Sequence, residues 1–320
     1  MRRLRIAGLA LLVTTLLIIL GPFLVPVPPL PCTPSAERLA GPNGTFVRID
    51  DLDLYAEIAG QGAPALVLLH GFAASAYSFS DVLPALAQRS LVVAYDRPAF
   101  GLSSRPLWPY RDMENPYTPE AQADQAVALM DALGIDRAVL VGHSAGGGLA
   151  VLVALRHPER VQALVLVAPA VRVNDTPDWL RLVLRTPQAR YLAPLAARAL
   201  PLNAPLLLRI AFHDLRAVTP DKIEGYSRPF RFCGWDRALA ELVISGSPPY
   251  LGDVIGGLDV PILLITGDDD HIVPTADTLR LARDLPHAEI VVVPECGHIP
   301  HEEHPDVFLR AVTDFLDRLE

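Results

Sequence analysis

The first hydrophobic feature of the chain is a long apolar run near its N-terminus. No charged residue occurs between Arg5 and Glu37, and Ile6 to Val27 is long enough to cross a bilayer, which takes roughly 20 apolar residues in a helix. A helix of a soluble core shows a polar face, and this run shows none. The proline-rich stretch that follows, PVPPLPCTP, is typical of a stiff spacer. Residues 1–36 are therefore predicted to be a membrane anchor with its spacer.

Charge beside this run predicts its orientation. Arg2, Arg3 and Arg5 lie at its start, and a basic flank stays on the cytoplasmic side of a membrane. The sequence thus predicts a single-pass membrane protein whose remaining residues lie outside the cytoplasm. The alternative is a cleaved signal peptide and a secreted protein, although the apolar region of such a peptide usually has about 7 to 15 residues. Cys32 lies where a lipoprotein cysteine would, but Pro31 replaces the small residue that precedes it in such signals.

Beyond this segment, short apolar runs recur along the chain. Most have four or five residues and are bounded by Gly, Pro or Asp, a pattern typical of strands that are buried on both faces of a parallel sheet. Two stretches on either side of Asp50-Asp51 predict an antiparallel hairpin. The predicted strands are Phe46–Ile49 and Leu54–Ile58 in the hairpin, then Ala65–Leu69, Leu91–Ala94, Ala138–Val141, Ala163–Val167, Ile262–Thr266 and Ile290–Val293.

Helical patterns lie between these strands. Thr118 is an N-cap residue, Pro119 fits the first helical turn, and Gly134 ends the same pattern. Pro305 begins a last amphipathic helix. Strands that alternate with helices predict an α/β fold, with a mostly parallel central sheet and helices on both faces.

Residues 172–252 interrupt this alternation. They contain no strand-like run but many large apolar side chains, prolines and arginines. We interpret them as a helical cap inserted between two parts of an α/β core, residues 37–171 and 253–320. The aromatic residues of the cap, among them Trp179 and Trp235, either fill a small core of its own or face the cleft below. Because the cap is so rich in apolar groups, we expect some of them to face the cleft.

Composition excludes several classes of protein. Hydrophobic residues make up 51% of the 320 residues, enough for a large core. The formal charge of −9 argues against a nucleic-acid partner. No CxxC pair is present, which excludes a thioredoxin-type motif and a zinc ribbon. Cys233 and Cys296 would be able to pair outside the cytoplasm, but nothing in the sequence brings them within bridging distance, so we expect no disulfide between them.

The most informative motif is GHSAG at residues 142–146, a G-x-S-x-G sequence. It lies between a predicted strand and a helical pattern, which is the position of a nucleophile elbow. The turn is so sharp that side chains two residues before and after Ser144 would collide, which accounts for Gly142 and Gly146. Ser144 would lie at a helix N-terminus, where free N–H groups stabilise a developing anion. Ser144 is therefore the candidate nucleophile, and an idle serine in a glycine-rich turn is the alternative.

A serine nucleophile needs a base, and the base needs a third group to orient it. One predicted strand ends in GDDDHIVP, and the next is followed by His298. Both segments follow the carboxyl ends of strands, the edge of an open α/β sheet where ligands bind. His298 is the candidate base, and the three consecutive aspartates, Asp268, Asp269 and Asp270, leave the acid open.

Together these stretches resemble the α/β-hydrolase superfamily, in its capped branch. The matching segments are His70-Gly71-Phe72, Asp96 to Ser104, GHSAG, GDDDHIVP and GHIPHEEHP, in the family's order. The family pattern G-x-x-D-x-x-x-P selects Asp270, so the resemblance implies a triad of Ser144, Asp270 and His298.

The resemblance has three further implications. The backbone N–H groups of Phe72 and Ala145 would form an oxyanion hole. Residues between Asp96 and Ser104 would brace a loop beside the site, although ordinary turn chemistry explains them equally well. Relatives with aspartate at the elbow are epoxide hydrolases and dehalogenases, and Ser144 speaks against both activities.

No cofactor or metal is expected. His301, Glu302, Glu303 and His304 suggest a zinc site, but their spacing is not H-E-x-x-H. His70 and His143 are expected to make structural hydrogen bonds, because one base is enough for Ser144.

The expected reaction is acyl transfer to water through an acyl-enzyme. An apolar cap and a membrane tether predict a small hydrophobic ester or a related acyl substrate. The same scaffold serves C–C bond hydrolases, perhydrolases, aminopeptidases and thioesterases, so these activities stay open. A membrane-anchored binding protein without catalytic activity is a further alternative.

Overall fold

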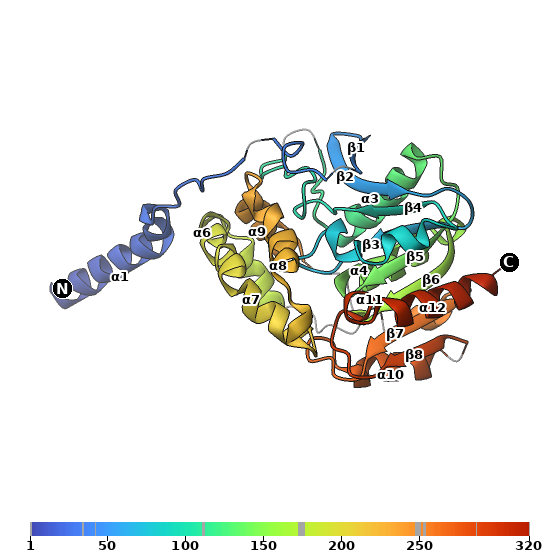
Figure 1. Ribbon diagram of the computed structural model, residues 1–320. Coiled ribbons are helices and arrows are strands. Elements are labelled where there is room, and N and C mark those ends of the chain that lie inside the picture. The colour runs from blue at the N-terminus through green and yellow to red at the C-terminus, as the bar shows by residue number, and fades with distance from the viewer. Residues whose placement is uncertain are drawn as a thin grey trace.

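The computed structural model describes residues 2–33, 35–41, 43–110, 113–171, 177–246, 251, 254–285 and 287–319. Figure 1 shows a long N-terminal helix that projects from the body, a group of helices beside it, and a sheet that helices cover on both faces. The predicted α/β fold is confirmed.

Within the described residues, the sheet has eight strands in the order β1-β2-β4-β3-β5-β6-β7-β8. β1 and β2 form the predicted hairpin, β2 pairs antiparallel with β4, and every later pair is parallel. Each predicted strand is present, with small changes at its ends. The strands are β1 Gly44–Ile49, β2 Leu52–Ala59, β3 Ala65–Leu69, β4 Val92–Tyr95, β5 Ala138–His143, β6 Val161–Val167, β7 Ile262–Gly267 and β8 Glu289–Val293.

Alternate residues of the central strands pack on opposite faces of the sheet, because side chains of a strand alternate. Val67 and Leu69 face α3 and α4, whereas Leu66 and Leu68 face the layer that contains α2 and α12. The helices of the core are α2 Leu83–Leu86, α3 Pro119–Ala132, α4 Ala145–Arg156, α10 Thr275–Asp284, α11 Pro300–Glu303 and α12 Pro305–Asp317, with 3-10 turns η2 Ala76–Phe79, η3 Pro158–Arg160 and η6 Ile255–Gly257.

Helix α3 begins and ends where the sequence predicts. The Thr118 side chain accepts a hydrogen bond from Ala121 N–H, and Pro119 occupies the first turn. Gly134 follows the helix with φ +67°, a backbone conformation that suits glycine.

In the part of the chain that the structure describes, five helices between β6 and β7 form the segment that we call the cap. They are α5 Asp178–Leu184, α6 Pro187–Ala197, α7 Ala199–Ala211, α8 Pro220–Ser227 and α9 Trp235–Ser245, with 3-10 turns η4 Leu215–Ala217 and η5 Arg228–Arg231. The described residues of the cap contain no strand. Its α7 meets the carboxyl edge of the sheet, where the carbonyl of Ala211 accepts a hydrogen bond from His298 N–H at 2.7 Å. The predicted cap limits, residues 172 and 252, lie outside the described residues, so they stay predictions.

The N-terminal helix α1, Arg2–Leu20, continues into the 3-10 turn η1, Gly21–Leu24. The span Arg5–Leu24 has a mean hydropathy of 2.4, and none of it is buried against the body. Its length and composition meet the requirements of a membrane-spanning helix and also those of a signal sequence.

Residues 21–33, which we call the strap, dock on the cap (Figure 1). Tyr191 on α6 donates its hydroxyl to the carbonyl of Val25 at 3.0 Å, and its ring lies 5.2 Å from that of Phe23. Arg198 donates to the carbonyl of Pro28 at 2.6 Å. The proline-rich stretch is therefore more than a spacer, because several of its described residues contact the cap.

A disulfide between Cys32 and Cys233 links the strap covalently to the cap, with a Cα–Cα distance of 5.0 Å. Beside it, Thr33 N–H donates to the carbonyl of Arg231 at 2.7 Å. The sequence did not predict this pairing. The expectation that Cys233 does not pair with Cys296 is confirmed, because Cys296 is free and buried.

We expect Cys32→Ser to lower the free energy of unfolding by about 2 to 4 kcal/mol, because the disulfide restricts the unfolded chain. The two cysteines are separated by 201 positions, which makes the closed loop long. Denaturant unfolding of the full chain in detergent, followed by near-ultraviolet circular dichroism, measures this change. Reductant should move the parent's midpoint to that of the variant and leave the variant unchanged. If reductant left the parent's unfolding midpoint unchanged, the disulfide would not stabilise the fold.

Candidate active site

Ser144 occupies a sharp turn between β5 and α4. Its backbone has φ +53° and ψ −119°, and its N–H donates to the carbonyl of Val167 at the end of β6, at 2.9 Å. Positive φ strains a residue that carries a side chain, and such strain is concentrated at functional sites. The turn presents Ser144 at the N-terminus of α4, as the motif predicts.

The two glycines of the motif make this turn possible. A Cβ atom on Gly142 would lie 2.5 Å from the carbonyl oxygen of Gly146, and one on Gly146 would lie 2.0 Å from the carbonyl oxygen of Leu69. Both distances are far below van der Waals contact, so any side chain at either position would displace backbone.

Asp270 and His298 come together from the loops that follow β7 and β8. His298 Nδ1 lies 2.8 Å from Asp270 Oδ2, and the two side chains are only 5% and 0% exposed. The other carboxylate oxygen, Oδ1, accepts hydrogen bonds from the N–H groups of Ile272 and Val273. Asp270 is therefore fixed by three hydrogen bonds and orients the imidazole.

The other two aspartates face elsewhere. Asp268 Oδ1 accepts a hydrogen bond from Cys296 N–H. Asp269 is half-buried and accepts a hydrogen bond from the ring of His213 at 2.7 Å, a contact that lowers the pKa of Asp269. Of the three candidates, Asp270 is the one that reaches His298.

The loop of His298 also lies against the elbow. His143, the residue before Ser144, donates from Nε2 to the carbonyl of His298 at 3.0 Å, and the two rings are 4.8 Å apart. Within the residues that the structure describes, Ser144 Oγ and His298 form no hydrogen bond. Such bonds are often long in enzymes without substrate and shorten when substrate binds. The structure thus brings Asp270 to His298 and the loop of His298 to the elbow. It does not join the candidate base to the Ser144 hydroxyl.

The predicted oxyanion-hole residues lie on two sides of Ser144. Ala145 is the first residue of α4, where the N–H has no acceptor within the helix. Phe72 follows Gly71, and a Cβ on Gly71 would lie 3.3 Å from Ser144 Cβ, so this loop contacts the nucleophile. The role of the two N–H groups stays a prediction.

A network of buried polar groups braces the loop after β4. Asp96 accepts hydrogen bonds from Ala76 and Leu102, both at 2.7 Å, and burial raises the pKa of Asp96 to about 6. Arg97 donates to the carbonyl of Gly71 at 3.3 Å, which ties this network to the loop of Phe72. The contacts favour the bracing role over isolated turn chemistry.

Two further histidines near the site make structural hydrogen bonds, as expected. His70 Nδ1 lies 2.8 Å from the carbonyl of Gly71, and its Nε2 accepts from Arg97 N–H. His143 binds the His298 carbonyl. Burial lowers the pKa of both rings well below the ordinary value, helped by Arg97 at His70 and by His298 at His143.

His301, weighed above as a metal ligand, is instead buried beside the elbow, a position that was not predicted from the sequence. Its ring stacks on Phe79 at 5.0 Å and lies 4.8 Å from that of His143. Neither ring nitrogen has a hydrogen-bond partner in the described part of the chain. Burial, with a contribution from His298, lowers the pKa of His301 to about 3. The ring is therefore a neutral packing element beneath the elbow.

The acidic residues next to His301 are engaged elsewhere. Glu302 accepts hydrogen bonds from Lys222 at 2.7 Å and Tyr226 at 2.5 Å, and Glu303 accepts from Gly297 N–H at 2.8 Å. Among the described residues, no group of three His, Cys, Asp or Glu side chains is arranged to hold a metal ion.

A cavity of about 760 Å³ lies between α6, α7 and α9 and reaches the loop of Phe72. Leucine, alanine, valine and isoleucine line most of it, and Asn203 is the one polar residue of its described lining. As expected, apolar side chains of the cap line a cavity, and most of them are aliphatic. Trp235 instead packs with Phe100 and Tyr117, and Trp179 is exposed.

Residues 64–305 match the family model described as alpha/beta hydrolase fold. A 2-hydroxymuconate semialdehyde hydrolase of Pseudomonas putida is 33% identical over 279 residues, which cover 80% of this chain and 88% of that protein. Among solved structures, a meta-cleavage product hydrolase from Pseudomonas fluorescens IP01 aligns with a TM-score of 0.70 and 27% identity, over 87% of this chain and 98% of that one. A bacterial membrane phospholipase A aligns over 100% of this chain and 99% of its own, with a TM-score of 0.67 and 24% identity, which is a likeness of fold alone.

We expect His301→Leu to change how stability depends on pH. Between pH 6.5 and 3 the unfolded chain binds a proton at this residue that the folded chain does not, so the buried imidazole costs stability as the pH falls. From pH 7 to pH 5 the variant should therefore gain about 2 kcal/mol relative to the parent. Urea unfolding of the full chain at several pH values measures the difference.

A matched change, His271→Leu, removes an imidazole whose side chain is 67% exposed. It should not reproduce the gain of His301→Leu, because no buried imidazole is removed. A His301→Leu curve that is parallel to the parent's would contradict the burial argument.

Proposed function

Because the chain belongs to the α/β-hydrolase family, we propose that it is a serine hydrolase that cleaves a hydrophobic ester or a related acyl substrate. The observation that carries the proposal is the hydrogen bond between His298 Nδ1 and Asp270 Oδ2, on a loop that contacts the residue before Ser144. This bond leaves Nε2 of the imidazole available to accept the proton of a serine hydroxyl.

In the proposed mechanism, Ser144 attacks the acyl carbonyl while His298 takes its proton. Asp270 holds the imidazole in the required tautomer and stabilises the imidazolium that forms. The N–H groups of Phe72 and Ala145 bind the oxyanion, and His298 returns the proton to the leaving alcohol. Water then attacks the acyl-enzyme by the reverse path and releases the acid.

The cavity supports a hydrophobic acyl group as the substrate portion that the cap binds. Its lining buries apolar surface and offers Asn203 as its one described polar side chain. An apolar chain gains roughly 0.8 kcal/mol for each CH₂ group that it buries. A charged group in the same place would lack a partner, which is costly.

C–C bond hydrolysis is the second candidate, and the 33% identity with the 2-hydroxymuconate semialdehyde hydrolase favours it. The substrate named for that relative carries a carboxylate. The described lining of the cavity contains no arginine, lysine or histidine to pair with a carboxylate, so we rank the ester activity first.

We also propose that α1 stays in the membrane and that the cap and core lie outside the cytoplasm. Arg2, Arg3 and Arg5 precede the apolar span, which favours this orientation. The Cys32–Cys233 disulfide is an independent argument, because such bonds persist in oxidising compartments. A secreted form that has lost α1 is the alternative. Its cap and core would also lie outside the cytoplasm.

The neighbouring aspartates offer a matched pair of variants that tests the proposal. Asp270→Asn should lower kcat for p-nitrophenyl esters on the order of 10⁴-fold, because the imidazole loses its orienting carboxylate. Asp269→Asn should leave kcat within a few-fold of the parent, because Asp269 contacts the exposed rings of His213 and His271. The measurement is steady-state hydrolysis by the purified full chain in detergent.

Retention of activity by Asp270→Asn, or an equal loss in both variants, would refute the proposed triad.

Across acyl lengths, kcat/KM should rise from acetate to octanoate because longer chains bury more apolar surface. Faster turnover of a 2-hydroxymuconate semialdehyde than of any ester would favour the second candidate. A parent that turns over neither substrate class would support a binding protein without catalytic activity.

A further inference from the structure

Two cap helices expose rows of large apolar side chains. On α7, Leu202, Leu206 and Ile210 recur every four residues and are 82%, 56% and 40% exposed. This spacing places them on one stripe of the helix. On α5, Trp179 and Leu182 are 64% and 70% exposed. Single exposed leucines are normal on a protein surface, but a group of this size marks an interaction site.

These rows border the opening of the 760 Å³ cavity. Leu184 of α5 and Leu206 and Leu207 of α7 line it, and so does Val243 of α9. Leu206, Leu207 and Val243 are also exposed. The apolar surface of the cap is therefore continuous with the apolar lining of the cavity.

The same helices are basic in an otherwise acidic protein. Residues 178–211, which include α5, α6 and α7, contain five arginines and one acidic residue, Asp178, whereas the formal charge of the whole chain is −9. Two of these arginines, Arg190 and Arg198, pair with acidic residues of α9, and the other three lie in or directly after α5 and in α7. Arginine-rich amphipathic helices that also carry tryptophan and leucine are typical of helices that lie in a membrane interface. Arginines near an anionic lipid surface are attracted to it electrostatically.

The strap fixes these helices beside the end of the apolar span. Gln188 of α6 donates to the carbonyl of Ile19 on α1 at 3.2 Å, and the Phe23 and Tyr191 rings pack together just beyond. The Cys32–Cys233 disulfide links the other end of the strap to the cap. Figure 1 shows α6 and α7 on the side of the body from which α1 projects. A bilayer that contains α1 therefore has the cap at its surface.

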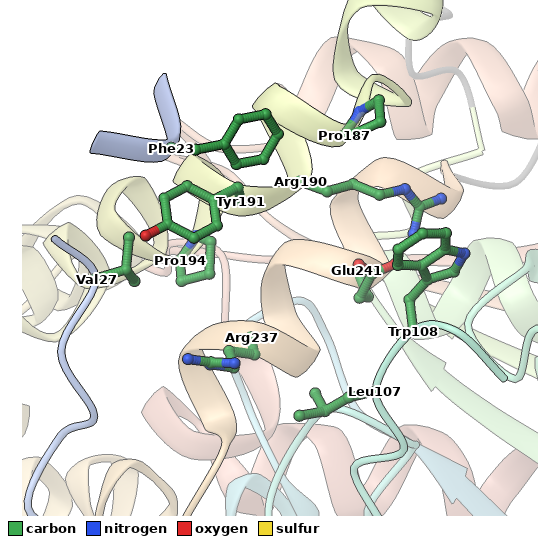
Figure 2. A pocket seen from close by; sticks show the side chains of 10 residues that line it. All are labelled: Phe23, Val27, Leu107, Trp108, Pro187, Arg190, Tyr191, Pro194, Arg237 and Glu241. Carbon is green, nitrogen blue, oxygen red and sulfur yellow. The ribbon is translucent and has the colours of Figure 1, made fainter. Parts of the chain in front are cut away.

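The side chains around the strap suit the level of lipid headgroups. Figure 2 shows Phe23, Tyr191, Trp108, Arg190 and Arg237 around a second cavity, of about 290 Å³, between strap and cap. Arg190 lies over the Trp108 ring at 5.2 Å and is paired with Glu241. Tryptophan, tyrosine and arginine are the residues that gather at membrane–water interfaces.

We propose that the outer face of α5 and α7 is a membrane-binding surface, which the strap and its disulfide hold on an anionic phospholipid bilayer. The apolar rows enter the outer leaflet and the arginines contact headgroup phosphates. The mouth of the cavity then opens toward the acyl chains of the bilayer. The surface itself rests on the exposed apolar rows, the basic helices and the strap that ties them to α1. Its use for substrate entry rests on the proposed function and names the substrate class as lipid acyl esters taken from the membrane.

A fluorescent label on the apolar row tests whether this surface is in the bilayer. The dye NBD is attached to Leu202→Cys or, as the matched control, to Leu279→Cys, where the native leucine on α10 is 40% exposed. The full chain is reconstituted in phosphatidylglycerol–phosphatidylcholine vesicles whose acyl chains are brominated. The label at 202 should shift its emission to the blue and be quenched, and the label at 279 should do neither. Equal behaviour of the two labels would overturn the proposal.

Two charge substitutions test what the surface does for turnover. Leu182→Asp and Leu202→Asp should lower hydrolysis of a long-chain ester in vesicles by about 10-fold or more and leave hydrolysis of a soluble acetate ester unchanged, because a carboxylate resists entry into the apolar leaflet. Leu279→Asp is the control and should change neither rate. An equal fall with both substrates, or no fall with the vesicle substrate, would contradict a membrane-specific role.

The two experiments separate the inference from the proposed function. A parent that hydrolyses no ester would refute the function, while the quenching experiment would still decide whether the cap lies in the bilayer. Quenching at 202 without any hydrolysis would support the surface alone.

Discussion

The arrangement of the site depends on the backbone conformation of one residue. Ser144 holds φ +53° between a buried strand and a helix, and it does so only because Gly142 and Gly146 leave room for the backbone around them. Conformations of this kind cost on the order of 1 to 3 kcal/mol and persist where the surrounding structure over-determines them. Here the surroundings are the parallel strands β5 and β6, which are buried on both faces.

The loops after neighbouring strands converge on this turn, and the cap holds one of them in place. His143 contacts the carbonyl of His298, while the carbonyl of Ala211 at the end of α7 accepts the His298 N–H. The imidazole is thus positioned from the core through Asp270 and His143, and from the cap through Ala211. The strap adds a third connection, because it joins α1 to the cap that contacts His298. Helix α1, the cap and the candidate base are thus linked by a continuous series of contacts.

The sequence predicted what local patterns determine. The strands, the N-cap residue Thr118 of helix α3 and the elbow at Ser144 each follow from a few neighbouring residues, and all are present. Spacing alone left three aspartates open, and the family pattern selected the one that bonds His298. The sequence did not predict the Cys32–Cys233 bond, because 201 positions separate residues that only the fold brings together. The burial of His301 was not predicted, because its neighbours in sequence, Glu302, Glu303 and His304, are polar. Most of the cavity lining is aliphatic, and Trp235 packs with Phe100 and Tyr117 instead.

The most direct test of the proposed triad is covalent labelling of the folded full chain with a fluorophosphonate, followed by mass spectrometry of its peptides. The reagent reacts with a serine whose hydroxyl is activated by a base. The triad predicts a single phosphonylated residue, Ser144, and complete loss of labelling in Ser144→Ala. A folded parent that stays unlabelled, or a Ser144→Ala variant that is labelled as the parent is, would contradict it.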